Sequence, residues 1–88
     1  MDFRWNDWNL DHATSHGISV DEIEALIESA RSPFPEYRGD GKWIVVGSGK
    51  GGRFVQVIFL LDDDGTVYVI HARLLNDREK RRYRRRMR

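Results

Sequence analysis

Two short turn segments constrain the fold of this chain more than any other feature. Residues 48–52 (Ser-Gly-Lys-Gly-Gly) and residues 62–65 (Asp-Asp-Asp-Gly) separate three runs rich in β-branched and aromatic residues, at 43–47, 53–61 and 66–73. Strands joined by such short connections pair antiparallel, because a parallel crossover needs a dozen or more residues. The second half of the chain is therefore predicted to form an antiparallel β-meander.

Helical signals lie on both sides of these strands. Ser19 and Glu22 have the spacing of a capping box, and apolar residues follow at helical intervals to about Ala30. A weaker helical pattern covers residues 6–16, after a short ambiguous segment at 2–5 that is compatible with an edge strand. Asn76 and Glu79 repeat the capping-box spacing at the start of a basic C-terminal helix. This order predicts one α+β domain over residues 1–88, with two N-terminal helices, a meander of three to four strands and helices on one sheet face.

Composition narrows the class of protein further. The chain of 88 residues has no cysteine, which excludes disulfides and thiolate zinc sites and fits a reducing compartment. No apolar run approaches the roughly 20 residues of a membrane helix. The N-terminus lacks the pattern of a signal peptide. The expected location is the cytoplasm, with no membrane partner.

The net charge of +1 hides a strong polarity along the chain. Residues 1–40 carry nine acids and three arginines, whereas residues 76–88 carry eight basic residues and two acids. Such asymmetry indicates contact between the basic end and nucleic acid or an acidic protein. The alternative is a frayed basic tail that only aids solubility.

Arg53 and Arg73 form the leading candidate pair. When the hairpin closes through residues 62–65, the start of the second strand lies opposite the end of the third. The two arginines are then expected at one sheet edge, within reach of one phosphate. Converging guanidiniums stabilise the charge of a phosphoryl transition state. The alternative is that each arginine pairs with an acid at the surface.

Three further side chains are candidates for proton transfer. His71 is expected on the same face as Val67, Val69 and Arg73, where a neutral imidazole can act as a general base; the alternative is a packed core residue. Glu79 and Tyr83 lie four apart on one helix face and can act as base, acid or substrate clamp. Capping explains Glu79 equally well, and covering the sheet explains Tyr83 equally well.

Other residues are candidates for holding RNA. Trp43 can stack on an unpaired base, and Lys50 in its glycine-rich loop can approach a phosphate, although the loop lacks P-loop spacing. Lys42, Arg78 and Arg82 are the remaining basic candidates. His12 and His16 have the i, i+4 spacing of zinc ligands, but no third ligand is evident nearby, and capping and packing explain them better.

In their order and spacing, several fragments resemble the BrnT-type toxins of bacterial toxin–antitoxin systems. The matching fragments are Trp5-Asn-x-x-Asn9, His16-Gly17-Ile-Ser, Lys42-Trp43-Ile-x-x-Gly47, Gly52-Arg53-x-x-x-Val57, Ala72-Arg73 and Arg78-Glu79-x-x-x-Tyr83. The family's functional basic and aromatic positions match Lys42, Trp43, Arg53 and Arg73, and its C-terminal helix motif matches Glu79 and Tyr83. The chain departs from the family at Ser15, where a Lys is usual, and at His71, where a Ser is usual.

The resemblance implies a RelE-like fold and a metal-independent endoribonuclease, without a cofactor, that halts translation. It also implies neutralisation by a cognate antitoxin, with higher-order toxin–antitoxin oligomers among its assemblies. The expected reaction is attack of a ribose 2′-hydroxyl on the adjacent phosphodiester. The rival interpretation is a non-catalytic module that binds nucleic acid or protein through its basic C-terminal surface. A third is a scaffold whose acidic and basic ends assemble copies head to tail.

Overall fold

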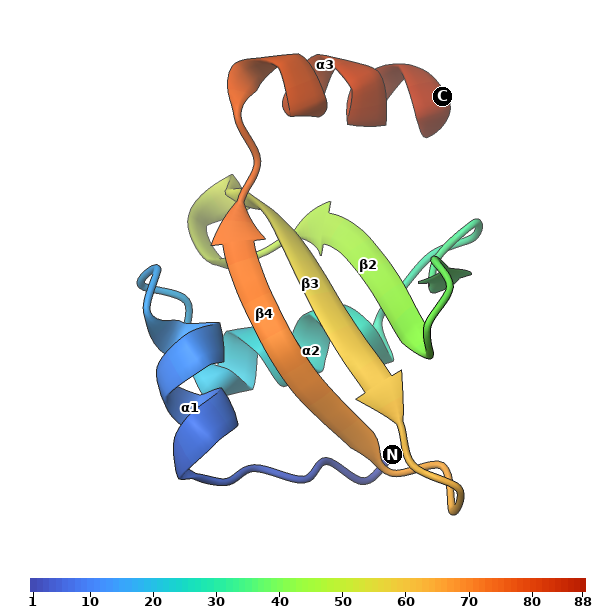
Figure 1. Ribbon diagram of the computed structural model, residues 1–88. Helices are drawn as coiled ribbons and strands as arrows, with labels where there is room; N and C mark the ends of the chain where they lie inside the picture. Colours follow the sequence, from blue (N-terminus) through green and yellow to red (C-terminus); the bar gives the residue numbers. More distant parts are fainter.

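An asparagine or serine side chain begins each of the three helices. The computed structural model describes all 88 residues, with α1 at Asp7–Thr14, α2 at Val20–Glu28 and α3 at Asp77–Arg86 (Figure 1). In each case the cap side chain accepts a hydrogen bond from the backbone N–H three residues later. The three predicted helices are therefore confirmed, although α1 ends two residues earlier than expected. None of them is long and apolar enough to cross a membrane.

The strands form one antiparallel sheet. Their order is β1-β2-β3-β4, with β1 at Glu36–Tyr37, β2 at Lys42–Ser48, β3 at Phe54–Leu61 and β4 at Val67–Leu74. A single 3-10 turn, Lys50–Gly52, joins β2 to β3. The predicted α+β class and the meander are confirmed, and the short β1 is the fourth strand.

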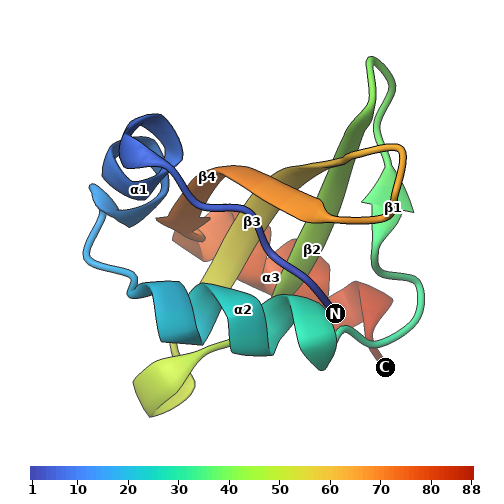
Figure 2. The same ribbon diagram turned by 90° about the horizontal axis from the view of Figure 1, so that it is seen from below.

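Helices α1 and α2 bury one row of side chains of the sheet. Val55, Val57 and Phe59 form the inner row of β3, and they are at most 3% exposed. They share one cluster with the apolar side chains of α2. Figure 2 shows α2 across one side of the sheet and α1 beside β4, whereas Figure 1 shows α3 across the end where β3 begins and β4 ends. The alternate side chains of β3, which we call the outer row, are Phe54, Gln56, Ile58 and Leu60.

A β-bulge interrupts the pairing of β3 with β4. Phe59 lies opposite Val69, but its neighbour Ile58 lies opposite His71. Strand β4 therefore contains one extra residue, Ile70, at this point. Every β4 side chain after the bulge is moved to the face opposite the one that regular alternation would assign to it.

The bulge corrects the predicted distribution of side chains on β4. Regular alternation predicts Val67, Val69, His71 and Arg73 in one row. In the structure, Val67 and Val69 are buried and Ala72 continues that inner row, so His71 and Arg73 lie in the outer row. The prediction of one shared face is wrong because it counted residues through the bulge.

Glu22 ties the start of α2 to the turn between β2 and β3. Ser19 caps the helix as predicted, but the Glu22 carboxylate does not return to the Ser19 backbone. It accepts hydrogen bonds from the Lys50 N–H (2.7 Å) and from Arg53 Nη2 (2.8 Å). A Cβ atom on Gly49 would come within 2.3 Å of Glu22 Oε2, so a larger residue there would displace the carboxylate from this position. The reciprocal half of the predicted capping box is therefore wrong.

Candidate functional site

Arg73, near the end of β4, is held by a two-pronged ion pair. Its Nη1 and Nη2 atoms donate to Glu79 Oε1 (2.8 Å) and Oε2 (2.7 Å). The same two nitrogens also donate to the Leu74 carbonyl (3.2 Å) and to Gln56 Oε1 (3.4 Å). The Nε–H has no hydrogen-bond partner within the protein. The guanidinium is therefore rigidly placed and keeps one donor free.

The cap of α3 positions Glu79 for this pairing. Asn76 Oδ1 accepts from the Glu79 N–H (2.9 Å), and Glu79 Oε1 accepts from the Asn76 N–H (3.0 Å), which completes the predicted capping box. The Arg73 guanidinium, and then the Asn76 N–H, lower the pKa of Glu79 to about 2. In return, the Glu79 carboxylate raises the pKa of Arg73. The two groups are both ionised and neutralise each other.

A small cavity lies beside this pair, between α3 and the outer row. Its volume is about 100 Å³, and Tyr83 forms part of its wall. The Tyr83 ring packs 5.4 Å from the ring of Phe54 and 6.2 Å from that of Phe34, and its hydroxyl has no hydrogen-bond partner. The Tyr83 hydroxyl and the guanidiniums of Arg38, Arg82 and Arg86 therefore lie around a cavity whose apolar wall is formed by Phe34, Ile44, Val46 and Leu75. The other lining residues are Phe34, Arg38, Ile44, Val46, Gln56, Leu75, Glu79, Arg82 and Arg86.

Arg53 does not join Arg73. Both arginines lie at the same end of the sheet, as predicted from the hairpin. However, Arg53 alternates with the inner row next to Val55 and bonds to Glu22, whereas Arg73 lies opposite Gln56 in the outer row. The two guanidiniums point to opposite faces, so the predicted phosphate site between them is wrong. The bulge in β4 and the attraction of Glu22 together separate them.

Lys42 and Trp43 are also far from Arg73. They begin β2 opposite Leu60 and Phe59, at the end of the sheet away from α3. The Trp43 ring contacts Tyr37 edge-on at 5.2 Å and packs against the core, so it is not the base-stacking partner of this site.

The three other predicted RNA-binding residues divide between two places. Lys50 lies in the turn held by Glu22, on the α2 side. Arg82 lines the cavity, and Arg78 is exposed one turn before it on α3. The predicted residues that the structure brings together are therefore Arg73, Glu79, Tyr83, Arg82 and Arg78.

His71 lies beside the site but does not line its cavity. It precedes Arg73 by two residues in the outer row, and its ring meets the His16 ring edge-on at 5.6 Å. Burial, and then the charges of His16 and Arg73, lower the pKa of His71 below its usual 6.5. The imidazole is therefore neutral at pH 7. The other histidine of the zinc-like pair, His12, stacks on the Trp8 ring at 3.8 Å.

Acidification is expected to destabilise the fold through His71. Because its folded pKa lies below 6.5, the unfolded chain binds a proton more readily, so stability is complete above about pH 6.5 and falls as the pH drops. Chemical denaturation of the parent and of His71→Gln at about pH 8 and about pH 5.5 measures this. The loss should be smaller in His71→Gln than in the parent. An equal loss in His71→Gln and the parent would contradict the assignment.

Gln56 and the arginine–glutamate contacts around the cavity were not anticipated from the sequence. Gln56 is the only polar residue within β3, and it could have been noticed as such. Glu36 of β1 pairs with both Arg38 (3.3 Å) and Arg86. The second of these pairs joins residues 50 positions apart, and no local sequence pattern predicts such a contact.

No protein-family model matches this chain, and no curated protein or solved structure matches it. What the site does must therefore be inferred from its own residues and from the resemblance noted in the sequence.

Proposed function

We propose that the protein is a RelE-like endoribonuclease of the BrnT type that holds single-stranded RNA on α3 and cleaves it beside Arg73. The observation that carries the proposal is the placement of Arg73, with one free N–H donor, on Glu79 at the foot of the basic helix. Glu79 and Tyr83, whose hydroxyl is unpaired, line the same cavity. A cytoplasmic location and a cognate antitoxin belong to the same proposal. They rest on the resemblance.

Helix α3 supplies the electrostatic attraction for RNA. Residues 78–88 contain eight basic residues, of which only Lys80 and Arg86 form ion pairs, with Asp77 and Glu36 respectively. Neutralisation of phosphates releases counterions, so binding through such a surface weakens steeply as salt rises. The six basic residues without an ion pair are Arg78, Arg81, Arg82, Arg84, Arg85 and Arg88.

The proposed reaction is an internal transesterification. The 2′-oxygen attacks the adjacent phosphorus, the bond from phosphorus to the 5′-oxygen breaks, and a cyclic phosphate remains. The Arg73 and Arg82 guanidiniums stabilise the negative charge on the phosphoryl oxygens. The Tyr83 hydroxyl donates its proton to the departing 5′-oxygen.

Glu79 is the proposed acceptor for the proton of the 2′-hydroxyl. While it is paired with Arg73, its pKa of about 2 makes it a weak base. A substrate phosphate that takes over the Nη donors of Arg73 displaces the carboxylate and returns its pKa towards the ordinary value. Glu79 then accepts the proton as the new bond forms.

Cleavage of a labelled single-stranded RNA tests the activity. Products ending in a 2′,3′-cyclic phosphate are expected, and a substrate with 2′-deoxyribose at the cleaved position should stay intact. Cleavage of that deoxy substrate would exclude the 2′-hydroxyl as nucleophile. If the protein bound the RNA without cleaving it, the proposed ribonuclease activity would be wrong.

The salt dependence of RNA binding tests the role of α3. In Arg78→Gln/Arg82→Gln, the slope of log K against log salt should fall by about 1.4, because each lost contact with single-stranded nucleic acid removes about 0.7. Lys42→Gln, at the far end of the sheet, is the control and should keep the parental slope. If the double variant and the parent had the same slope, Arg78 and Arg82 would not be in contact with the RNA.

The second candidate is a non-catalytic module that binds nucleic acid or an acidic protein through α3. The closed pair between Arg73 and Glu79 favours it, because four of the five N–H donors of Arg73 are already used within the protein. In that case Arg73 is a structural residue, and RNA bound to α3 remains uncut.

A further inference from the structure

An exposed aromatic stack lies on α1, away from the candidate site. The Trp8 ring lies nearly parallel to the His12 ring (3.8 Å, 17°) and to the Tyr68 ring (6.5 Å, 18°). Trp8 is 51% exposed, and His12 is also exposed, so the stack is accessible from solvent. We call Trp8, His12 and Tyr68 the aromatic platform.

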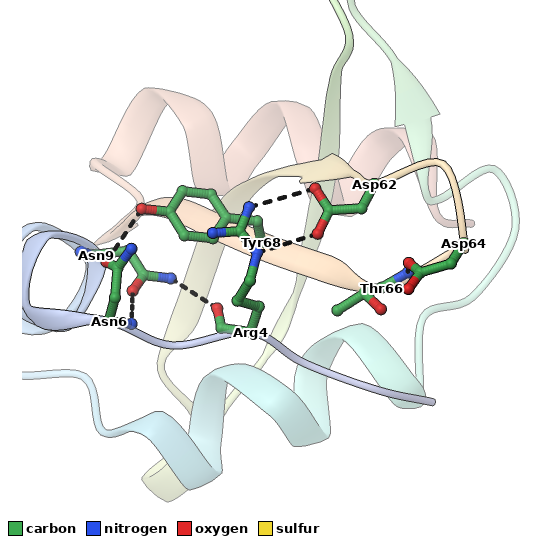
Figure 3. A network of polar contacts seen from close by, with 7 residues as sticks. All are labelled: Arg4, Asn6, Asn9, Asp62, Asp64, Thr66 and Tyr68. Atoms are coloured by element: carbon green, nitrogen blue, oxygen red, sulfur yellow. Dashed lines mark hydrogen bonds and ion pairs between the residues drawn. The ribbon is translucent and has the colours of Figure 1, made fainter.

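The N-terminal segment holds Tyr68 of the platform in a network of polar contacts (Figure 3). The Tyr68 hydroxyl donates to Asn6 Oδ1 (3.1 Å), and Asn9 Nδ2 donates to the Arg4 carbonyl (3.0 Å). The Arg4 N–H in turn donates to the carbonyl of Val67 (2.8 Å) at the start of β4. The segment predicted as an edge strand thus makes one bridge, from Phe3 to Val67, and fixes α1 against the hairpin.

The platform already binds one guanidinium of its own chain. The Cζ atom of Arg4 lies 3.9 Å from the centre of the Tyr68 ring, and its side chain pairs with Asp62 (3.0 Å). Guanidiniums favour this combination of an aromatic face and a carboxylate. Four exposed acids without an ion pair lie on the two segments that form and flank the platform: Asp7 and Asp11 on α1, and Asp63 and Asp64 in the β3–β4 turn next to Asp62.

The complementary surface of the molecule is α3. It carries the six basic residues without an ion pair, and among them Arg81, Arg85 and Arg88 follow one another at intervals of three and four residues, so they lie on one side of the helix. Tyr68 of the platform is the second residue of β4, whereas α3 lies across the end of the sheet where β4 finishes, and α1 lies beside β4 (Figure 1). One copy cannot place its own α3 on its own platform, but two copies can make the contact.

We propose that the aromatic platform receives the arginine-rich α3 of a second copy of this chain. Arginines of that helix stack on Trp8 and pair with Asp7 and Asp11, as Arg4 does with Tyr68 and Asp62. Each copy still has a free platform or a free α3 after one contact, so the association is head to tail and continues unless a ring closes. The same contact covers the helix that is proposed to hold RNA.

Sedimentation of the free protein tests this contact without RNA. The parent should associate at about 50 mM salt and dissociate at about 300 mM, because exposed ion pairs are screened. Trp8→Ala should weaken association about three- to five-fold, the usual size of one exposed cation–π contact. Glu28→Gln removes an exposed acid from α2 and is the matched control, so it should associate like the parent.

Mixing two variants tests the head-to-tail arrangement. Trp8→Ala/Asp11→Asn weakens the platform, and Arg81→Gln/Arg85→Gln weakens the basic stripe, so each alone should stay monomeric at a concentration where the parent only just associates. Their mixture keeps one intact platform and one intact α3, and it should form one-to-one dimers that do not grow. Circular dichroism melting of each variant checks that it is folded.

Three results would overturn the proposal. They are a parent that stays monomeric at low salt up to its solubility limit, a platform variant that associates like the parent, and a mixture that stays monomeric. Failure of RNA cleavage would leave all three measurements unchanged, so the two proposals can fail separately.

Discussion

Arg73→Ala is expected to reduce RNA cleavage by about 10²- to 10³-fold, the usual loss when one donor to a developing oxyanion is removed. The parental guanidinium is placed at the end of β4 by the Glu79 carboxylate and Gln56, which line the same cavity as Tyr83. Binding of RNA to α3 should weaken much less, because the other arginines of the helix remain. The measurements are single-turnover cleavage and binding of an uncleavable deoxy-substituted RNA.

Arg53→Ala is the matched control for Arg73→Ala. Both changes remove a guanidinium that pairs with a glutamate at the same end of the sheet, but only Arg73 faces α3. Arg53→Ala should keep near-parental cleavage at a temperature where it is folded. If Arg73→Ala cleaved RNA as fast as the parent, Arg73 would have only a structural role, and the non-catalytic binding module would be favoured. Equal, large losses in both variants would contradict the separation of the two arginines.

Glu22→Ala is expected to lower the free energy of unfolding by about 2–3 kcal/mol, because the Lys50 N–H and Arg53 both lose a buried acceptor. The carboxylate side chain is only 5% exposed, and no other group is placed to replace it. For a domain of this size the midpoint of thermal unfolding should fall by roughly 10–20 °C. Thermal and urea denaturation measure the loss.

Glu28→Ala is the control, because Glu28 is an exposed acid at the end of α2 without an ion pair. It should change stability by no more than about 0.5 kcal/mol. Glu22→Gln should lie between the parent and Glu22→Ala, since its amide oxygen can still accept from the Lys50 N–H. A Glu22→Ala protein as stable as Glu28→Ala would show that the β2–β3 turn does not depend on this carboxylate.

The local structure could be predicted because it depends on residues close together in the chain. Asn76 and Glu79 are three residues apart, and their reciprocal hydrogen bonds need nothing from the rest of the molecule. The same holds for the turn at residues 62–65, which is too short for anything but antiparallel pairing. Helices, strands, the meander and the joint position of Glu79 and Tyr83 on α3 all follow from such short-range rules.

Which side chains meet was decided only in the tertiary structure. One extra residue at the bulge in β4 moves Arg73 to the outer row, and nothing in the run Tyr-Val-Ile-His-Ala-Arg marks where the bulge falls. The buried Glu22, 31 residues away in sequence, draws Arg53 to the opposite face. One inserted residue moves every later side chain of a strand to the opposite face of the sheet. A buried carboxylate needs a partner of opposite charge, and the fold decides which cation lies close enough to pair with it. The sequence therefore determines that both arginines reach one end of the sheet, and packing determines that they point apart.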